Sequence, residues 1–154
     1  RRVLFRSPSY VSMLGFVPGL PWSYQMVRRE QMLEVPKYVR PRTDTPARAL
    51  SHGGAFAAIY PVQGPGGYQL FAICAAPIFD PTQSLPDFKD SFAVFRGGDI
   101  LKFRPVDRAE YDALREEVEA GVFRYRKIDV EFDPSQFFAD PDAYNAELLR
   151  RLYA

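Results

Sequence analysis

Apolar residues in the first two thirds of the chain gather in short runs that Pro and Gly separate. Runs of this kind, bounded by turn residues, are typical of β-strands. The sequence therefore predicts strands in five segments, which are 10–16, 53–62, 67–79, 91–95 and 100–106. Two of them, 53–62 and 67–79, are apolar at nearly every position. Such continuous runs suit strands that are buried on both faces, as in a closed barrel.

The spacing of apolar and polar residues changes after residue 106. Asp107 and Glu110 form a capping-box pattern, and Gly121 ends the helical stretch that follows. A strand is predicted at 122–132, where polar and apolar residues alternate. A last helix begins at Asp140, which is a cap residue followed by Pro in the first turn. The sequence thus predicts a mainly β domain over 8–106 and an extension of helix, strand and helix over 107–154.

A corner of four residues, Gly64-Pro65-Gly66-Gly67, connects the two most apolar runs. It lacks the spacing of a phosphate-binding glycine loop. The residue types favour a tight turn that needs positive φ at Gly66 or Gly67 over a backbone that approaches a ligand. Residues 25–35 are open between a short helix and a loop, and Trp22 and Tyr24 fit either a pocket lining or a plug of the barrel.

Composition removes several classes of function. The 20 basic and 19 acidic residues leave a net charge of +1, which gives no electrostatic footprint for nucleic acid or for anionic lipid. Cys74 is the single cysteine, so an internal disulfide and a cysteine-based metal site are excluded. We expect no metal on this chain and a reducing, cytoplasmic setting. His52, the single histidine, lies in "LSHGG" and is expected to be structural, at a strand end or turn.

The first seven residues, "RRVLFRS", match one reading frame of a common sequencing adapter. We expect residues 1–7 to be non-native and leave them out of the fold prediction. The natural protein is then expected to extend upstream, with a further region before residue 8.

Six motifs occur in a characteristic order along the chain. They are "GFVPGLPW" at 15–22, "PRT" at 41–43, "IYPV" at 59–62, "GPGGYQL" at 64–70, "FDP" at 79–81 and "GGDILKFRPV" at 97–106. Together they resemble the carboxyltransferase C/D-subdomain family, also known as the family of allophanate hydrolase subunit 1 and of the 5-oxoprolinase B-subunit. The resemblance implies a cyclophilin-like closed β-barrel that is normally preceded by a smaller α/β subdomain.

The tail after residue 106 looks like the extension that follows the barrel in urea carboxylases. The resemblance therefore implies part of a biotin-dependent carboxyltransferase, which moves a carboxyl group from carboxybiotin to a urea-like or amide nitrogen. Its partners would be subunit 2 of the same enzyme and a carrier that holds the biotin. ATP would act at the level of the complex. Two alternatives remain, namely ATP-dependent amide or lactam hydrolysis of the 5-oxoprolinase type and a non-catalytic, kinase-inhibitor-like binding protein.

The resemblance also carries candidate substrate-binding residues over to matching positions, but it assigns no catalytic residue. The candidates are Phe16, Pro18, Gly19, Arg42, Tyr60, Pro61, Gly66, Gly67 and Asp80. The sequence departs from the family pattern at 56–58, Phe-Ala-Ala in place of Gln-Thr-Gly, and at 72–74, Ala-Ile-Cys in place of Gly-Arg-Thr. Loss of these polar groups indicates a more apolar substrate, or a structural or regulatory role for the barrel.

Overall fold

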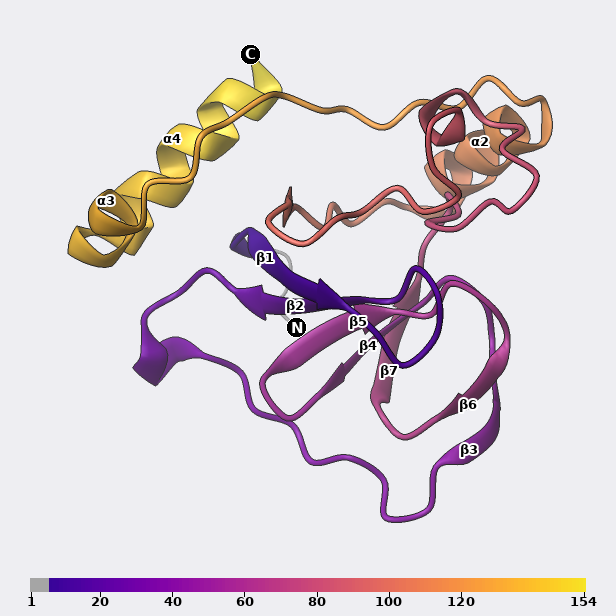
Figure 1. The fold of residues 1–154 in the computed structure, drawn as a ribbon, viewed down its shortest axis with the longest axis horizontal. Coiled ribbons are helices and arrows are strands. Elements are labelled where there is room, and N and C mark those ends of the chain that lie inside the picture. Colours follow the sequence, from indigo (N-terminus) through magenta and orange to yellow (C-terminus); the bar gives the residue numbers. More distant parts are fainter. Residues whose placement is uncertain (1–5) are drawn as a thin grey trace.

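The centre of the molecule is an antiparallel sheet of six strands. The computed structural model describes residues 6–154. The strand order is β7-β4-β5-β2-β1-β8 (Figure 1). The bounds are Ser9–Leu14 for β1, Pro21–Gln25 for β2, Ala49–Gly53 for β4, Phe56–Ile59 for β5, Gln69–Ile73 for β7 and Ile100–Leu101 for β8. The predicted strands at 10–16, 53–62 and 67–79 thus correspond to β1, β5 and β7.

Two shorter strands form a separate ribbon beside the sheet. β3 covers Arg42–Thr45 and pairs with β6, which covers Gly64–Gly66. The glycine corner is therefore itself a paired strand. Two 3-10 turns, η1 at Arg29–Gln31 and η2 at Pro86–Phe88, complete this part of the chain, and η1 places the uncertain segment 25–35 among the loops.

The C-terminal extension lies over one side of the sheet (Figure 1). It contains α2 at Arg108–Glu119, α3 at Pro134–Ala139 and α4 at Pro141–Tyr153. The predicted caps are confirmed: Asp107 accepts from the Glu110 N–H, and Asp140 accepts from two N–H groups of the first turn of α4. Gly121 ends α2 with a φ of 72°. Helix α3 was not predicted, and its Asp133 cap is followed directly by Pro134.

The expected closed barrel is not formed. Within residues 6–154, β7 and β8 are the two edges of the sheet and do not pair with each other. The strand predicted at 100–106 is reduced to Ile100–Leu101, and Pro105 offers no N–H for a longer ladder. The strand predicted at 91–95 retains one bridge, between Ala93 and Phe79. The fold is therefore mainly β, with an open sheet and C-terminal helices.

The strand predicted at 122–132 is also wrong. Residues 122–133, which we call the strap, cross from α2 to α3 without joining a sheet. Their alternation has another cause, since Tyr125 turns inward: its hydroxyl donates to Pro77 O at 2.7 Å and its ring packs 6.4 Å from that of Phe95. The Tyr125 N–H donates to Asp87 at 2.6 Å. Side chains thus provide the hydrogen bonds that a neighbouring strand would have provided.

The sequence also hid the central strand β4. All five of its residues are buried, including His52, which is 0 % exposed. The segment "LSHGG" thus runs through the middle of the sheet, and β5 and β7 flank it on either side. β7, by contrast, is an edge strand: Leu70, Phe71 and Ile73 are all exposed, although the apolar run predicted burial on both faces.

The two faces of the sheet carry different clusters. On one face, Ala57 and Ile59 of β5 pack with Val11, Leu50 and Leu101. On the other, Ala58 packs with Leu20, Ala49 and Tyr60. Successive residues of β5 alternate between these faces, as the geometry of a strand requires. Each face also borders a cavity, and the two cavities are different in kind.

Candidate functional site

A pocket of about 410 Å³ lies against the face of the sheet that carries Ala58. Its lining joins the β1–β2 turn, the loop before β3, strand β5 and the β6 corner. The lining residues are Phe16, Leu20, Trp22, Lys37, Tyr38, Pro41, Ala58, Tyr60, Pro65, Gly66, Gly67 and Tyr68. Four of the sequence-predicted site residues, Phe16, Tyr60, Gly66 and Gly67, thus come together from three separate motifs.

The surroundings of Gly66 explain why the corner at 64–67 contains glycine. Neither Gly66 nor Gly67 has a positive φ, so the turn explanation based on φ is wrong. A Cβ on Gly66 would lie 2.6 Å from both Thr45 Oγ1 and Tyr60 Cζ. Such distances are shorter than any ordinary contact. The residue is therefore glycine because the Tyr60 ring packs directly on this backbone.

The β1–β2 turn places Phe16 at the mouth of the pocket. Phe16 has a φ of 74°, which is unusual for a bulky residue, and it is 65 % exposed. Gly19 also has a positive φ, of 79°, and its position leaves just enough space for the Phe79 ring. The strained backbone of a bulky residue such as Phe16 persists only where surrounding structure holds it, and strain of this kind concentrates at functional sites. Gly19 and the exposed Pro18 shape this turn but do not line the pocket.

Arg42 supports the pocket from behind. Its guanidinium donates to Tyr68 O at 2.7 Å and lies 5.3 Å from the centre of the Tyr38 ring. It thus links two residues of the lining without lining the pocket itself. Pro61 follows Tyr60 and is buried outside the lining.

Polar groups are few on the pocket wall. The Lys37 ammonium lies 5.2 Å from the centre of the Tyr68 ring. The Tyr68 hydroxyl is buried without a hydrogen-bond partner. Burial raises the pKa of this phenol, and the nearby Tyr60 and Tyr24 add to the effect. Trp22 donates from Nε1 to Gly15 O at 3.3 Å, which fixes its indole against the turn.

Asp80 lies outside the pocket and organises its own loop. The carboxylate accepts five hydrogen bonds, from the N–H and hydroxyl groups of Thr82 and Ser84 and from the Leu85 N–H. Burial alone would raise the pKa of this carboxyl, but the hydrogen bonds outweigh burial and hold the pKa far below its usual range. The geometry gives Asp80 a structural role.

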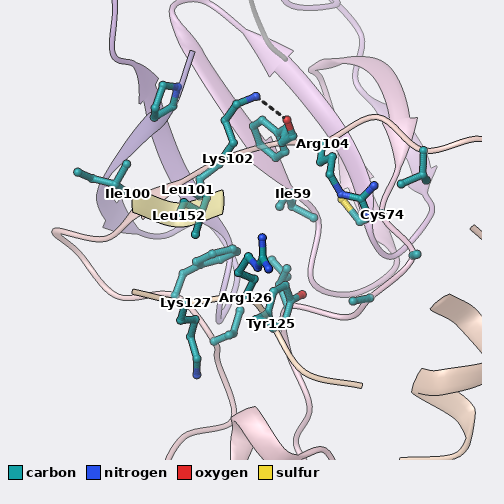
Figure 2. A pocket seen from close by; sticks show the side chains of 18 of the residues that line it. Ile59, Cys74, Ile100, Leu101, Lys102, Arg104, Tyr125, Arg126, Lys127 and Leu152 are labelled. Atoms are coloured by element: carbon teal, nitrogen blue, oxygen red, sulfur yellow. Dashed lines mark hydrogen bonds between the residues drawn. The ribbon is translucent and has the colours of Figure 1, made fainter. Parts of the chain in front are cut away.

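A second and larger cavity, of about 1360 Å³, lies on the opposite face of the sheet, beneath the C-terminal extension (Figure 2). Ile59 and Leu101 belong to its sheet side, whereas Tyr125 and Arg126 reach it from the strap. Lys102 donates to Phe103 O at 2.9 Å within this cavity, and burial lowers the pKa of its ammonium. None of the predicted site residues lines it.

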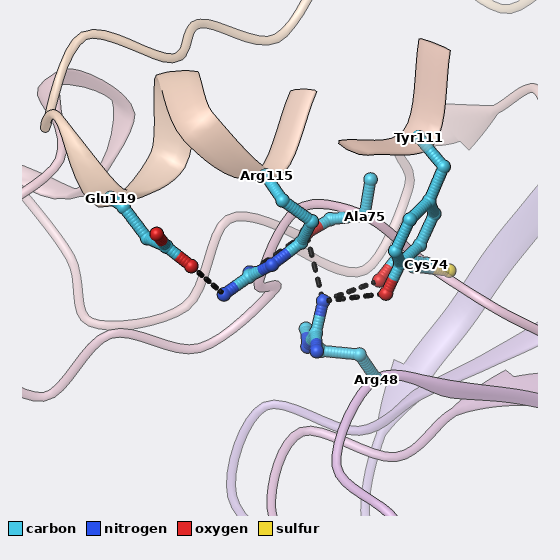
Figure 3. A network of polar contacts seen from close by, with 6 residues as sticks. All are labelled: Arg48, Cys74, Ala75, Tyr111, Arg115 and Glu119. Carbon is cyan, nitrogen blue, oxygen red and sulfur yellow. Dashed lines mark hydrogen bonds and ion pairs between the residues drawn. The ribbon is translucent and has the colours of Figure 1, made fainter. Parts of the chain in front are cut away.

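One polar network attaches α2 to the sheet (Figure 3). Arg48 donates from one nitrogen to Cys74 O and Ala75 O, both at 2.9 Å, and to the Tyr111 hydroxyl at 3.4 Å. Arg115 donates to the same Ala75 O at 3.0 Å. Burial raises the pKa of the adjacent Cys74 thiol to about 11, against the opposing effect of Arg48. Cys74 is therefore a protonated packing residue, not a nucleophile.

His52 has both ring nitrogens buried without a partner. Burial lowers the pKa of the imidazole, so the ring is neutral in the middle of β4. It borders neither cavity. The expectation of a structural histidine agrees with this position, although the position is a central strand and not a strand end or turn.

Sequence reasoning missed several residues of the lining, and the most polar or aromatic of them are Lys37, Tyr38 and Tyr68. The first two lie in the proline-rich segment before β3, which has no regular structure. Tyr68 packs directly on β4, because a Cβ on Gly53 would come within 2.7 Å of three atoms of the Tyr68 ring. A conspicuous signal existed in the two aromatic residues that sit beside prolines and glycines.

Neither a membrane-spanning helix nor a metal centre is apparent in the described part of the chain. Among residues 6–154, no helix is both long and apolar enough to cross a bilayer. The same residues contain no group of three or more His, Cys, Asp or Glu side chains that could hold a metal ion.

The fold and the pocket together indicate the class of protein. The fold is an open antiparallel sheet with C-terminal helices, and the pocket is aromatic and lies among segments rich in glycine and proline. Residues 2–88 match the family model of the carboxyltransferase domain, subdomain C and D. The match covers more than half of the chain, and the chain belongs to this family.

Curated relatives fall into two groups. The chain is 34 % identical over 107 residues to the 5-oxoprolinase B-subunit of Bacillus subtilis, which is 70 % of this chain and 41 % of that protein. It is 30 % identical over 131 residues to a putative urea carboxylase of Emericella nidulans, which is 82 % of this chain and 10 % of that protein. The chain thus spans about two fifths of the length of the oxoprolinase subunit and a much smaller share of the carboxylase.

Two solved structures are similar to different shares of the chain. The urea amidolyase of Kluyveromyces lactis superposes on 99 % of this chain with a TM-score of 0.76 and 26 % identity, over 9 % of its own length. A conserved uncharacterized protein from Pyrococcus horikoshii superposes on 71 % of this chain with a TM-score of 0.59 and 25 % identity, over 47 % of its length. The likeness to the amidolyase therefore includes the C-terminal extension.

Proposed function

We propose that this chain is part of a biotin-dependent carboxyltransferase of the urea carboxylase type, which delivers a carboxyl group to a urea-like or amide nitrogen. The observation that carries the proposal is the pocket in which Phe16, Tyr60, Gly66 and Gly67 meet. These residues belong to the motifs that recur in the family, and they lie far apart in sequence. The superposition of nearly the whole chain on a urea amidolyase supports the choice within the family.

Transfer of a labile carboxyl group needs a site that excludes water and stabilises developing charge. The pocket supplies an apolar floor at Ala58 and aromatic walls, so water competes poorly inside it. Phe56, which stands where the resemblance predicts Gln, makes the region beside the pocket still more apolar, whereas Ala57 belongs to the opposite face of the sheet. The Phe56 ring packs 5.1 Å from that of Trp22, directly beside the pocket.

The residues present fit biotin, which a partner carrier would bring. Its thioether ring is apolar and its flat ureido ring is polar, and Trp22 and Tyr60 offer apolar surfaces for the thioether ring. The buried, unpartnered Tyr68 hydroxyl would hold a polar edge of the ring. When bound, biotin supplies the carboxyl group for transfer; the side chains of this chain orient the ring and keep water away. The partners are then subunit 2 of the same enzyme and the carrier, with ATP used elsewhere in the complex.

A second candidate is ATP-dependent amide or lactam hydrolysis of the 5-oxoprolinase type. It is favoured by the higher identity, 34 %, to the Bacillus subtilis protein. Both candidates use the same pocket, and both require a second subunit, so reconstitution separates them.

The test is co-expression of the full-length protein with its neighbouring subunit and a biotin carrier. The complex is assayed for carboxylation of urea, guanidine and amide acceptors, and in parallel for ATP-dependent lactam opening. Phe16→Ala should reduce the productive activity, whereas Met13→Ala, a change at another exposed position outside the pocket lining, should leave it intact. Lactam opening alone would favour the second candidate. Partner binding without turnover of either kind would indicate a non-catalytic interaction protein.

A further inference from the structure

Five aromatic side chains and one cation give the pocket a distinct chemical character. Phe16, Trp22, Tyr38, Tyr60 and Tyr68 supply the aromatic surface, and Lys37 is the one charged side chain among the lining residues of the described chain. The volume of about 410 Å³ is that of a small-molecule site. Aromatic walls favour a ligand that presents a flat ring to them.

Lys37 has no counter-ion of its own. Among residues 6–154, no carboxylate lies within ion-pair distance of its ammonium group. Its recorded contact is with the face of the Tyr68 ring, at 5.2 Å. A cation without a counter-ion at the edge of an apolar pocket raises the local concentration of anions and orients them as they enter.

Tyr68 supplies a second anchoring point. Its hydroxyl is buried and makes no hydrogen bond within residues 6–154. A buried hydroxyl in this state carries a desolvation cost, which a ligand atom within reach would remove. The Lys37 ammonium lies over the ring of the same residue, so the two side chains line the same part of the pocket.

We propose that the acceptor taken by this pocket is a flat aromatic acid, that is, an aryl ring with one carboxylate and an amide or ureido nitrogen. The aryl ring packs against Tyr38, and the carboxylate faces Lys37. Urea itself offers neither an aromatic face nor a charge. The choice of acceptor rests on the proposed carboxyl transfer, but ligand binding to the pocket does not depend on that reaction.

Binding is measured without any partner subunit. Trp22 is the single tryptophan of the chain and lines the pocket, so its fluorescence reports occupancy directly. The probes are 4-ureidobenzoate, phenylurea and urea, each also titrated by calorimetry. We expect the affinities to fall in that order, with 4-ureidobenzoate roughly two- to fivefold tighter than phenylurea because an exposed ion pair contributes little more than this.

Two variants separate the charge from the ring. Lys37→Gln should remove the preference for 4-ureidobenzoate over phenylurea, whereas Arg40→Gln, which removes an exposed charge three residues away and outside the lining, should retain it. Tyr38→Ala should weaken both aromatic probes by a similar factor, roughly three- to tenfold, and keep their ratio.

Equal affinities for 4-ureidobenzoate and phenylurea in the unaltered chain would overturn the proposal, as would binding of urea as tight as that of either aromatic probe. An equal loss of preference in Arg40→Gln would show a diffuse charge effect and would also overturn it. Binding with the expected ranking but no carboxylation by the reconstituted complex would count against the proposed function alone.

Discussion

Gly66 illustrates how one residue can define a pocket by what it lacks. The Tyr60 ring and the Thr45 hydroxyl occupy the space where a side chain would begin. Gly66→Ala should therefore displace Tyr60 and destabilise the fold by about 1–3 kcal/mol, as overpacking generally does. Thermal or denaturant unfolding measures this loss, and Trp22 fluorescence measures the loss of the pocket.

Gly64 provides the matched control for that change. It lies in the same strand, β6, and a Cβ at this position would meet nothing within 4 Å. Gly64→Ala should leave both stability and probe binding unchanged within error. Equal effects of the two substitutions would mean that strand propensity, not crowding by Tyr60, is what requires glycine at 66.

Removal of the Tyr68 hydroxyl should change the stability in the opposite direction. Because it is buried without a partner, Tyr68→Phe should stabilise the free protein, by about 1 kcal/mol. The same change should weaken ligand binding if the hydroxyl meets a polar ligand atom. Unfolding and titration of the same variant test both effects, and a loss of stability would show that the hydroxyl is satisfied in the free protein.

At the scale of elements, the strap depends on one carboxylate. Asp87 accepts from the Tyr125 N–H at 2.6 Å and pairs with the Lys127 ammonium at 2.5 Å. Burial alone would raise the pKa of Asp87, but the Lys127 and Tyr125 hydrogen bonds and the charges of Lys127 and Arg124 lower it overall. A carboxyl with a lowered pKa stabilises the fold above its ordinary range and loses that contribution as the pH falls through the lowered value.

We therefore expect the strap to loosen on acidification, below the ordinary titration range of aspartate. Hydrogen exchange at the Tyr125 amide, followed as a function of pH and corrected for the intrinsic rate, measures it. Asp87→Asn should raise the exchange at neutral pH and remove the acid step. An acid step that persists in Asp87→Asn would assign it to another carboxyl.

Elements also show what a sequence can predict. The ends of α2 and α4 follow from local caps, Asp107 and Asp140, whose partners lie within three residues. Those predictions were correct. β4 could not be found this way, since "LSHGG" has weak strand propensity and is held by neighbours on both sides. The strap was mistaken for a strand because inward aromatic residues alternate with charged ones, whatever the backbone pairs with.

The candidate site was also predicted only in part. Phe16, Tyr60, Gly66 and Gly67 were named from motifs and share one pocket. Asp80 was named on the same basis, but its five hydrogen bonds all stay within its loop, a local use that a motif does not reveal. Lys37 and Tyr38 lie in a segment without periodicity, and the signal there was limited to an aromatic residue close to prolines.

At the scale of the whole molecule, Arg48 and Arg115 join the extension to the sheet. Arg48→Met removes three hydrogen bonds and leaves the Cys74 carbonyl with fewer donors. Bonds from a charged donor contribute more than neutral ones, so we expect a loss of about 2 kcal/mol and faster hydrogen exchange throughout α2. Arg108→Met is the control: its pair with Asp112 is exposed, and its loss should leave the stability almost unchanged.

The acceptors of this link are backbone carbonyls, which do not titrate, and the Tyr111 hydroxyl. Guanidinium groups also keep their charge at every pH that proteins ordinarily meet. The bonds by which Arg48 and Arg115 join α2 to the sheet therefore use no carboxylate, in contrast to the strap that follows α2 in the chain. On acidification, the C-terminal extension should therefore detach in a fixed order. The strap should separate from the sheet first, while α2 is still attached to it.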